Sequence, residues 1–350
     1  MHKMSRDEKY MQRALDLAAL GTSWARPNPI VGCVVVHENK IIGEGWHQRY
    51  GGPHAEVNAL NSVQDKSLLP HCQVYVTLEP CSHYGKTPPC ADFLIQHGVR
   101  DVVICNTDPN PLVSGRGIRK LTEAGCKVHI GVLKEEGLEL NRRFFTFQIR
   151  KRPYLVLKWA ESADGFIALP NYQATQISGS LAKQLVHKWR TEEQAILVGT
   201  RTALHDNPQL NTRHWPGPAP LRIAIDKHLN IPATHHLLDD SQPTLVYTYQ
   251  EKQATIQTTF AILSPDEDFL PQMLTDLYQR NVQSVLVEGG TLLLEAFLQA
   301  NLWDEIRVLK SPKKLGEGVK APQLPALPFS SRMKVGDDEL TVYRNQHQFL

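Results

Sequence analysis

The sequence predicts an α/β protein built from two domains. Segments with the composition of strands alternate with segments of helical periodicity along the chain, which indicates sheets covered by helices on both faces. The length of 350 residues exceeds what one hydrophobic core usually supports. The basic segment RKRP at 150–153 precedes a new predicted strand, so we place the boundary near residue 148, with domains at 1–147 and 148–350.

The charge and the distribution of apolar residues argue against a nucleic-acid-binding protein, a membrane protein and a secreted protein. The formal charge is only +2, from 38 basic and 36 acidic residues without a long basic run, so a footprint for a nucleic-acid backbone is missing. No apolar run approaches the roughly 18 residues that a membrane span requires, and the first ten residues lack the apolar core of a secretory signal. We therefore expect a cytoplasmic protein with no membrane partner and no disulfide framework among its six cysteines.

The first half begins with a helix. Ser5 and Glu8 form a capping-box pattern, apolar residues follow at helical spacing, and Gly21 ends the helix. The remaining elements predicted for this half are, in order, a hairpin of strands at 30–36 and 40–45, a helix containing HAEVNAL (54–60), a strand at 73–78, a helix to about 96, a strand at 101–105, a helix to about 124, a strand at 127–131 and a helix at 134–150.

The second half begins with the strand YLVLKWA (154–160). Its further predicted elements are, in order, a helix at 180–190, strands at 195–199, 221–226, 244–249 and 284–290, a helix at 291–300 and a strand at 304–310. The proline-rich segments 214–220 and 322–328 predict loops.

Three residues of the first half have the chemistry of a catalytic zinc site. His54 begins a predicted helix, Cys81 follows a predicted strand, and Cys90 begins the next predicted helix. A catalytic Zn²⁺ takes three nitrogen or sulfur ligands and leaves one position for water. A cysteine near a helix N-terminus has a lowered pKa, which favours metal binding.

Glu56 lies two residues after His54 and offers the nonligand carboxylate that water activation and proton transfer require. His-x-Glu followed by Pro-Cys and a second Cys is the pattern of zinc deaminases, although eight residues separate Cys81 and Cys90 where two are usual. A purely structural zinc is the alternative. The other cysteines lie in or beside apolar strands and are interpreted as small buried hydrophobes: Cys33, Cys72, Cys105 and Cys126.

Two turns between a strand and a helix in the second half are candidate phosphate sites. Gly289 and Gly290 form one turn, and Gly199 and Thr200 form the other. Free backbone N–H groups at a helix N-terminus can hold a phosphate, although tight packing alone also explains such glycines. The G-x-G-x-x-G pattern of a Rossmann fold is missing.

The motifs PNPIVG (27–32), HAEVNAL and EPCSHYGKTPPC (79–90) resemble the deaminase half of the bifunctional riboflavin-biosynthesis deaminase–reductase family, in which the widened cysteine spacing is typical. The resemblance implies a cytidine-deaminase-like three-layer α/β/α domain. It also implies that Asn28 contacts the pyrimidine and that His83 and Lys86 help to bind the substrate.

The motifs LKWAESADGFIA (157–168), TALHDNPQLNTR (202–213) and VEGGTLL (287–293) are similar to the reductase half of the same family. The resemblance implies a fold like dihydrofolate reductase. It implies that these residues bind NADPH: Ala160, Gln176, Thr202, Asp206, Gly290, Thr291 and Leu292. It implies that these residues hold the substrate: Ala174, Arg190, Leu210, Arg213 and Glu288. In the segment ATQIS (174–178), Ala174 and Gln176 depart from the family's usual Ser-x-Trp, which puts one substrate contact and one cofactor contact in question.

The reaction implied by the resemblance has two steps. A zinc-activated water deaminates 2,5-diamino-6-(5-phosphoribosylamino)pyrimidin-4(3H)-one with Glu56 transferring the proton, and NADPH then reduces the ribosyl group to a ribityl chain. The family also implies a homodimer or a larger homo-oligomer. Three alternatives stay open at this point: an RNA base deaminase, a binding protein with a structural zinc, and a deaminase with a noncatalytic second half.

Overall fold

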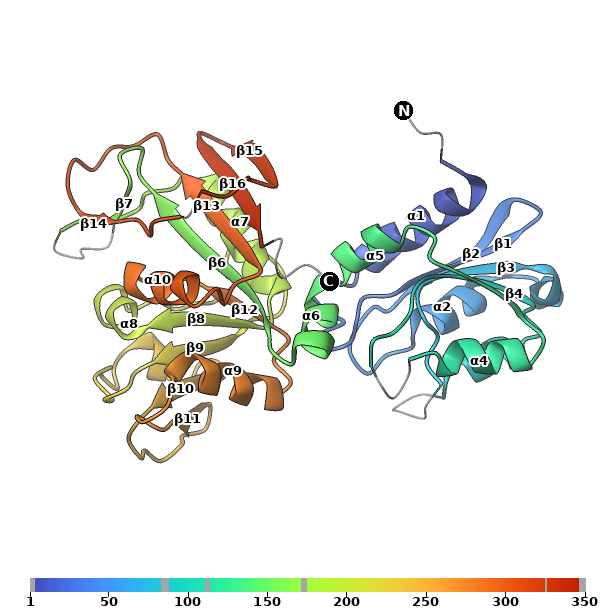
Figure 1. Ribbon diagram of the computed structural model, residues 1–350, viewed down its shortest axis with the longest axis horizontal. Helices are drawn as coiled ribbons and strands as arrows, with labels where there is room; N and C mark the ends of the chain where they lie inside the picture. The colour runs from blue at the N-terminus through green and yellow to red at the C-terminus, as the bar shows by residue number, and fades with distance from the viewer. Residues whose placement is uncertain (1–3, 83–87, 111–113, 171–174, 325, 346–350) are drawn as a thin grey trace. The chain divides into compact units, whose positions relative to one another are not determined.

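The computed structural model describes residues 4–82, 88–110, 114–170, 175–324 and 326–345 (Figure 1). The chain divides into two compact units, Met1–Arg150 and Lys151–Leu350. Residues 147 and 148, between which the sequence places the boundary, lie inside the last helix of the first unit, α6 (Arg142–Arg150). Each unit contains its own sheet, and the two are described separately below.

The first unit is built on a five-stranded sheet with the order β2-β1-β3-β4-β5. The hairpin β1–β2 is antiparallel, β1 also pairs antiparallel with β3, and β3, β4 and β5 are parallel. The strands are β1 (Gly32–His37), β2 (Lys40–Trp46), β3 (Gln73–Leu78), β4 (Asp101–Asn106) and β5 (Lys127–Ile130).

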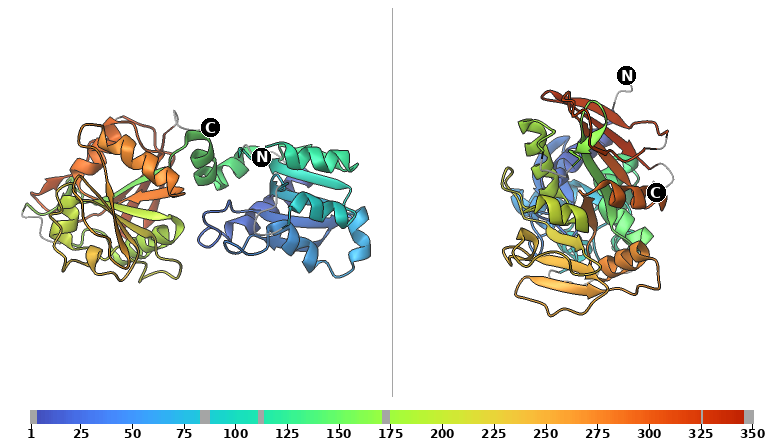
Figure 2. Two further views of the ribbon diagram at one scale, coloured as in Figure 1. Left: turned by 90° about the horizontal axis from the view of Figure 1, so that it is seen from below. Right: turned by 90° about the vertical axis from the view of Figure 1, so that its left-hand side faces the viewer.

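Helices cover both faces of this sheet, as Figures 1 and 2 show. One face packs against α1 (Arg6–Ala19) and α5 (Lys134–Leu140). The opposite face packs against α2 (Ala55–Ser62), α3 (Cys90–Gln96) and α4 (Arg116–Glu123), and a short 3-10 helix η1 (Lys66–His71) precedes β3. The expected three-layer α/β/α arrangement is confirmed, and the backbone layers pack closely: a Cβ added to Gly32 of β1 would lie 1.9 Å from the carbonyl oxygen of Ala14 in α1.

Asn141 interrupts the single helix that the sequence predicts over 134–150. The backbone of Asn141 ends α5, and α6 begins at Arg142. The buried side chain of Asn141 accepts a hydrogen bond from the N–H of Ile30 at 2.9 Å and donates one to its carbonyl at 2.8 Å. The prediction of one uninterrupted helix was wrong at this residue, although the backbone of Asn141 keeps helical hydrogen bonds to Gly137 and from Phe145, at 3.1 and 3.0 Å.

The second unit contains a nine-stranded sheet with the order β11-β10-β9-β8-β12-β6-β13-β16-β15. The strands from β11 to β13 along this order are parallel, and the hairpin β15–β16 adds two antiparallel strands at one edge. The strands are β6 (Tyr154–Glu161), β8 (Ala195–Gly199), β9 (Leu221–Ile225), β10 (Thr244–Thr248), β11 (Thr258–Ile262), β12 (Ser284–Val287), β13 (Glu305–Lys310), β15 (Ser331–Val335) and β16 (Asp338–Arg344). A separate pair joins β7 (Phe166–Ala168) and β14 (Val319–Lys320).

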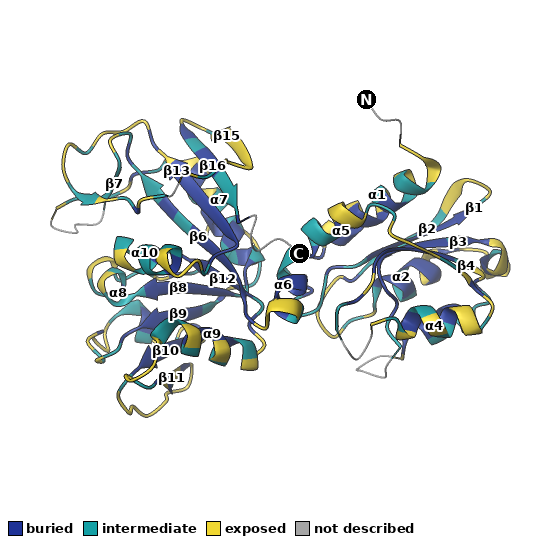
Figure 3. Cartoon of the chain, in the orientation of Figure 1, coloured by how far each residue is buried: buried dark blue, intermediate teal, exposed yellow. Residues whose placement is uncertain are grey.

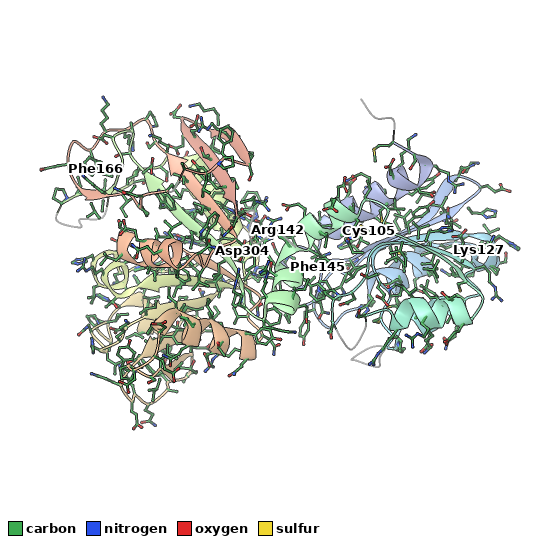
Figure 4. All side chains as sticks on the ribbon, viewed as in Figure 1. Cys105, Lys127, Arg142, Phe145, Phe166 and Asp304 are labelled. Atoms are coloured by element: carbon green, nitrogen blue, oxygen red, sulfur yellow. The ribbon has the colours of Figure 1, made fainter. Side chains whose placement is uncertain are left out.

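Helices also cover both faces of this sheet, whose strands are mostly buried (Figure 3). One face packs against α9 (Phe269–Gln279) and α10 (Thr291–Gln299). The other packs against α7 (Ser180–Glu192) and α8 (Thr200–Asp206), with the 3-10 helix η2 (His236–Leu238) beside them. Asp304, labelled in Figure 4, precedes β13 and receives two hydrogen bonds from Arg152, at 2.7 and 2.9 Å, at the start of the unit.

Two differences from the sequence prediction concern the second unit. The strand predicted at 284–290 ends at Val287, because Gly290 has a φ of +51° and turns the chain into α10. The sequence analysis also missed β11, α9, the β15–β16 hairpin and the β7–β14 pair. The strands β11 and β15 lack a regular alternation of buried and exposed residues, whereas α9 buries Met273, Leu274 and Leu277 at helical spacing and could have been recognised. None of the helices in the described part of the chain has the length and apolar character needed to cross a membrane.

Candidate active sites

The three predicted zinc ligands meet in the first unit. His54 is the N-cap residue of α2, Cys90 is the first residue of α3, and Cys81 follows β3. Nδ1 of His54 lies 3.2 Å from Sγ of Cys90 and 3.6 Å from Sγ of Cys81, and the potential ligand atoms all lie within 4.8 Å of one another. Residues separated by 36 positions therefore form one cluster at the ends of a strand and two helices.

The donor atoms of this cluster fit Zn²⁺. One imidazole nitrogen and two sulfurs are a ligand set that catalytic zinc sites use, and they leave a fourth position free. Hydrogen bonding from Cys90 and from His54 lowers the pKa of the Cys81 thiol to about 4, despite its burial. The backbone N–H of Cys90 also donates to Sγ of Cys81 at 3.3 Å, which further favours a thiolate there.

Glu56 lies in the first turn of α2 beside this cluster. Its side chain is buried, and it forms a hydrogen bond with the side chain of Cys90. Burial raises the pKa of the Glu56 carboxyl, although His54 opposes this shift. A carboxylate that touches one ligand residue and follows another by two positions is placed to hold a proton next to the metal.

Asn28 reaches the same site through a histidine that the sequence reading missed. Nδ2 of Asn28 lies 3.0 Å from Nε2 of His47, and Nδ1 of His47 lies 3.0 Å from the carbonyl oxygen of Pro53. The His47 ring packs edge-on against the His54 ring, with 5.3 Å between centroids. His47 is buried directly after β2, and nothing in its sequence spacing marks it out.

A buried glutamate anchors the loop that carries Cys81. The carboxylate of Glu79 accepts hydrogen bonds from the backbone N–H groups of Asp108, Gly115, Gly117 and Ile118, at 3.0 to 3.3 Å. These donors include the N-cap residue and first turn of α4, where a negative charge is favoured. His83 and Lys86, the predicted substrate residues of this loop, lie outside the described residues.

The second unit contains a cavity of about 1220 Å³ at the carboxyl ends of β6, β8, β9 and β12. The predicted cofactor residues all line it: Ala160, Gln176, Thr202, Asp206, Gly290, Thr291 and Leu292. Five lysine and arginine residues also line it: Lys158, Lys183, Arg201, Lys227 and Lys320. The turn through Gly289 and Gly290 leads into α10 and lies close to Thr202. A Cβ added to Gly290 would lie 3.2 Å from the threonine Oγ1. This cavity, with its glycine turn and its cations, fits a phosphate-bearing dinucleotide.

Glu288 is the centre of a buried ion-pair group at this cavity. Arg190 binds its carboxylate through two hydrogen bonds, at 2.9 and 2.8 Å, and Nζ of Lys158 lies 3.8 Å from it. Burial alone would raise the pKa of Glu288, but these two cations hold it at about 2. Burial in turn lowers the pKa of Lys158, against the effect of Glu288.

Lys158 is a functional candidate that the predicted residue set omits. Its sequence signal is a charged residue inside the apolar strand YLVLKWA. The Ser162 and Asp164 that follow it are structural: Asp164 accepts hydrogen bonds from the Ser162 hydroxyl and from the N–H groups of Leu315 and Gly316.

The remaining predicted substrate residues differ in placement. The side chain of Leu210 is buried in the core beside α8, so only the backbone of this residue can contact a ligand. Arg213 is exposed and bonded to the Asn211 side chain at 2.7 Å, and the backbone carbonyl of Asn211 also accepts a hydrogen bond from Arg190 at 3.1 Å. Ala174 lies outside the described residues.

Three potential zinc ligands beside a buried carboxylate in one unit, and a dinucleotide-sized cavity in the other, are the features of a zinc deaminase joined to a nicotinamide-dependent reductase. Residues 4–106 match the cytidine and deoxycytidylate deaminase zinc-binding region, and residues 153–348 match the RibD C-terminal domain. The riboflavin biosynthesis protein RibD of Aquifex aeolicus is 39% identical over 334 residues, which are 94% of this chain and 93% of that protein. The RibD protein of Escherichia coli is 38% identical over 331 residues, 90% of each chain.

Solved structures agree with these matches. Acinetobacter baumannii RibD superposes with a TM-score of 0.89 at 34% identity, covering 97% of this chain and 98% of that one. A diaminohydroxyphosphoribosylaminopyrimidine deaminase/5-amino-6-(5-phosphoribosylamino)uracil reductase from Thermotoga maritima superposes with a TM-score of 0.88 at 35% identity and the same coverage. The chain belongs to the RibD family. It is a deaminase and a reductase of riboflavin biosynthesis, and the cofactors of its two units are Zn²⁺ and NADPH.

Proposed function

We propose that the unit of residues 1–147 deaminates 2,5-diamino-6-(5-phosphoribosylamino)pyrimidin-4(3H)-one and that residues 148–350 reduce the ribosyl group of the product. The observation that carries this proposal is the presence of two sites in one chain: the cluster of His54, Cys81 and Cys90 beside Glu56, and the cavity around Glu288. The names of the relatives support the choice of substrate. When bound, Zn²⁺ supplies a Lewis acid to the first site and NADPH supplies reducing equivalents to the second.

In the deaminase site, the protein holds the ring and moves a proton. Asn28 and His47 form a hydrogen-bonded pair beside His54, so they are placed to orient a polar pyrimidine edge above the metal ligands. Glu56 takes the proton of the attacking water and delivers it to the departing ammonia, because it is the buried carboxylate in contact with the ligand cluster. His83 and Lys86 are proposed to complete the substrate site.

In the reductase site, the protein orients two ligands. The turn at Gly290, with Thr291, Leu292 and Thr202, is proposed to hold the cofactor phosphates at the start of α10. Ala160, Gln176 and Asp206 line the rest of the cofactor surface.

The substrate part of this site is proposed to contain Arg190, Arg213, Glu288, Ala174 and the backbone of Leu210. The reduction adds a hydride and a proton to the substrate. Lys158 lines this cavity and its Nζ lies 3.8 Å from the Glu288 carboxylate, so we assign the proton to this ammonium group. The ion pairs keep Glu288 charged and hold Lys158 in position.

Assembly and location are part of the proposal. We infer a homodimer or a larger homo-oligomer that works in the cytoplasm. The edge strand β15 supports this assembly, since it carries exposed Met333 and follows exposed Phe329 at the edge of the described sheet. Analytical ultracentrifugation of the full chain tests it, and a monomer at micromolar concentration would contradict it.

The experiment that tests the function follows two products in one sample. Zinc-loaded protein is given the diaminopyrimidine phosphate, and ammonia release and NADPH oxidation are measured together. We expect ammonia first and NADPH oxidation only as the deaminated product accumulates. Ammonia release from RNA in place of this substrate would favour an RNA base deaminase, and ammonia without NADPH oxidation would favour a noncatalytic second unit.

A further inference from the structure

The segment that leads into β1 carries Asn28 and has no regular secondary structure of its own. Residues 29–31 belong to no helix or strand and lie between a turn and Gly32, the first residue of β1. Ile30 is nonetheless buried, at 8% exposed, so its backbone N–H and carbonyl need partners within the protein. The conformation of this segment therefore depends on the groups that bind the backbone of Ile30.

One distant side chain binds both backbone groups of Ile30. The N–H of Ile30 donates to Oδ1 of Asn141 at 2.9 Å, and Nδ2 of Asn141 donates to the carbonyl of Ile30 at 2.8 Å. The two residues are 111 positions apart, and Asn141 is 4% exposed. The amide thus makes the pair of hydrogen bonds that a residue of an antiparallel strand would make. Because both bonds are buried and have normal lengths, they hold Ile30 in one position.

Apolar packing fixes the same segment. Phe144 and Phe145, in the first turn of α6, pack together with Leu78 at the end of β3 and with Val31. The backbone carbonyl of Asn141 accepts a helical hydrogen bond from the N–H of Phe145 at 3.0 Å. The Asn141 side chain therefore extends from an ordered junction between α5 and α6, and the aromatic residues beside it contact the neighbour of Ile30.

The segment held in this way supports the pair Asn28–His47. The N–H of His47 donates to the carbonyl of Val31 at 2.9 Å. Nδ2 of Asn28, two residues before Ile30, lies 3.0 Å from Nε2 of His47. One member of the pair is thus joined to Ile30 along the chain, and the other is joined to it through the carbonyl of the next residue.

The orientation of the Asn28 amide depends on this support. Nδ1 of His47 lies 3.0 Å from the carbonyl oxygen of Pro53, which can only accept a hydrogen bond, so this nitrogen carries a proton. In the neutral ring Nε2 then accepts a hydrogen bond from Nδ2 of Asn28. Oδ1 of Asn28 is left as an acceptor for an N–H or amino group of the pyrimidine. A shift of the segment would change what Asn28 presents to the substrate.

We propose that Asn141 is a positioning residue of the deaminase site. Through both backbone groups of Ile30, it holds Asn28 and His47 in the orientation that binds the pyrimidine. This inference rests on the proposed function of Asn28 and deepens it. Asn141 acts through Ile30 and takes no part in the transfer of the proton.

The competing explanation is that Asn141 only stabilises the fold by satisfying buried backbone groups. Both explanations expect Asn141→Leu, which has a similar size and no amide, to lower the stability of the first unit. Only a positioning role also changes the surroundings of the His47 ring and weakens substrate binding in protein that is still folded. The two explanations therefore differ in readouts other than stability.

The test uses the zinc-loaded full-length protein, its variants Asn141→Leu and Asn141→Asp, and one matched control. Leu140→Ala is the control, because Leu140 precedes Asn141 in α5 and packs against the core between α1 and the sheet. This change loosens the same helix and keeps the amide. The measurements are zinc content, thermal unfolding, NMR of the His47 ring without substrate, and KM and kcat for ammonia release from the diaminopyrimidine phosphate.

Asn141→Asp gives a second test that does not require removal of both hydrogen bonds. One oxygen of an aspartate can still accept from the N–H of Ile30, but the other oxygen, when ionised, faces the Ile30 carbonyl and repels it. Protonation restores a donor at that position. If the amide positions the site, the KM of this variant relative to the wild type should rise as the pH rises and the aspartate ionises.

We expect Asn141→Leu to bind zinc at the wild-type level and to change the Nε2 resonance of His47. Its deaminase KM should rise about tenfold with little change in kcat, which is the scale of one lost hydrogen bond. Leu140→Ala should unfold at a lower temperature and should keep the wild-type KM and His47 resonance.

A wild-type KM and an unchanged His47 resonance in folded Asn141→Leu would overturn the inference. An equal rise of KM in Leu140→Ala would also overturn it, because general loosening would then explain the effect. If Asn141→Leu does not fold, Asn141→Asp decides: a KM ratio to the wild type that is independent of pH would overturn the inference.

Failure of the proposed function has a different signature. The wild type would then release no ammonia from the diaminopyrimidine phosphate. The His47 resonance, which is measured without substrate, would still change in Asn141→Leu.

Discussion

The two sites of this chain are built in different ways. The deaminase site is a small cluster in which three ligand atoms lie within 4.8 Å of one another, held by helix ends and by backbone hydrogen bonds. The reductase site is a cavity of about 1220 Å³ whose residues come from several strand ends and are held by ion pairs. A metal needs a few atoms at fixed positions, whereas a dinucleotide and its substrate need a large surface. The first site should therefore be lost by one change, and the second should weaken in steps.

Removing one zinc ligand tests the all-or-none behaviour of the first site. Cys81→Ala leaves two ligands, so we expect zinc content to fall from about one per chain to near zero and ammonia release to fall at least ~10³-fold. Metal analysis and an ammonia assay measure this. Cys72→Ala is the control, since Cys72 is a buried free thiol outside the cluster. Zinc retained at about one per chain in Cys81→Ala would contradict the claim that one change abolishes the first site.

Breaking the ion-pair group tests the second site. Glu288→Gln leaves Arg190 and Lys158 without their carboxylate, and breaking a buried pair typically costs about 3–5 kcal/mol. We expect the reductase KM to rise about 100-fold while zinc content and ammonia release stay at wild-type levels. Steady-state NADPH oxidation measures the effect, with Glu295→Gln on α10 as the control. A variant with unchanged reductase kinetics would show that this ion-pair group does not serve the substrate.

A substitution in the turn at Gly290 should weaken the second site by a smaller amount. Gly290 has a φ of +51° and faces Thr202, so Gly290→Ala adds strain of about 1–2 kcal/mol at the cofactor surface. We expect the Kd for NADPH to rise about tenfold, measured by NADPH fluorescence. Gly316→Ala has a comparable φ of +79° with open space around it and does not line the cavity, so it should bind NADPH normally. Equal loss in both variants would assign the effect to general strain.

The smallest effect concerns pH and His187. Its pKa is about 4 in the folded protein, and about 6.5 is usual for an unfolded chain. Between these values the unfolded chain binds more protons than the folded one, so stability falls as pH falls through this window. At a pH of about 5.5 the loss is about 1 kcal/mol, and His187→Leu removes it. Hydrogen exchange of β8 and β12 amides at neutral pH and at this lower pH compares the two proteins, and the same pH response in both would contradict the assignment.

Much of the first site was predictable because its chemistry lies in short segments. His54, Cys81, Cys90 and Glu56 stand at element ends that the sequence pattern locates. The buried thiols were predictable for the same reason, and the structure confirms that Cys33, Cys72, Cys105 and Cys126 are buried. His47 was not predictable, since its place beside Asn28 depends on how the segment after β2 folds back on α2.

Less of the second site could be predicted, because its side chains bind one another across long sequence separations. Arg190 and Glu288 are 98 residues apart, and no local pattern pairs them. The hydrogen bonds between the Asn141 side chain and the backbone of Ile30 join residues 111 positions apart and could not be predicted for the same reason. Local pattern located most of the elements, and tertiary contacts decided which side chains became a site.

The measurement that tests the central claim most directly uses one substitution and two substrates. Glu56→Gln removes the carboxylate that moves the proton and keeps the size of the side chain. We predict that this variant binds zinc, releases ammonia from the diaminopyrimidine phosphate at least ~10²-fold more slowly, and oxidises NADPH at the wild-type rate when given the deaminated product. Wild-type ammonia release, or loss of NADPH oxidation with the deaminated product, would contradict two separate active sites in this chain.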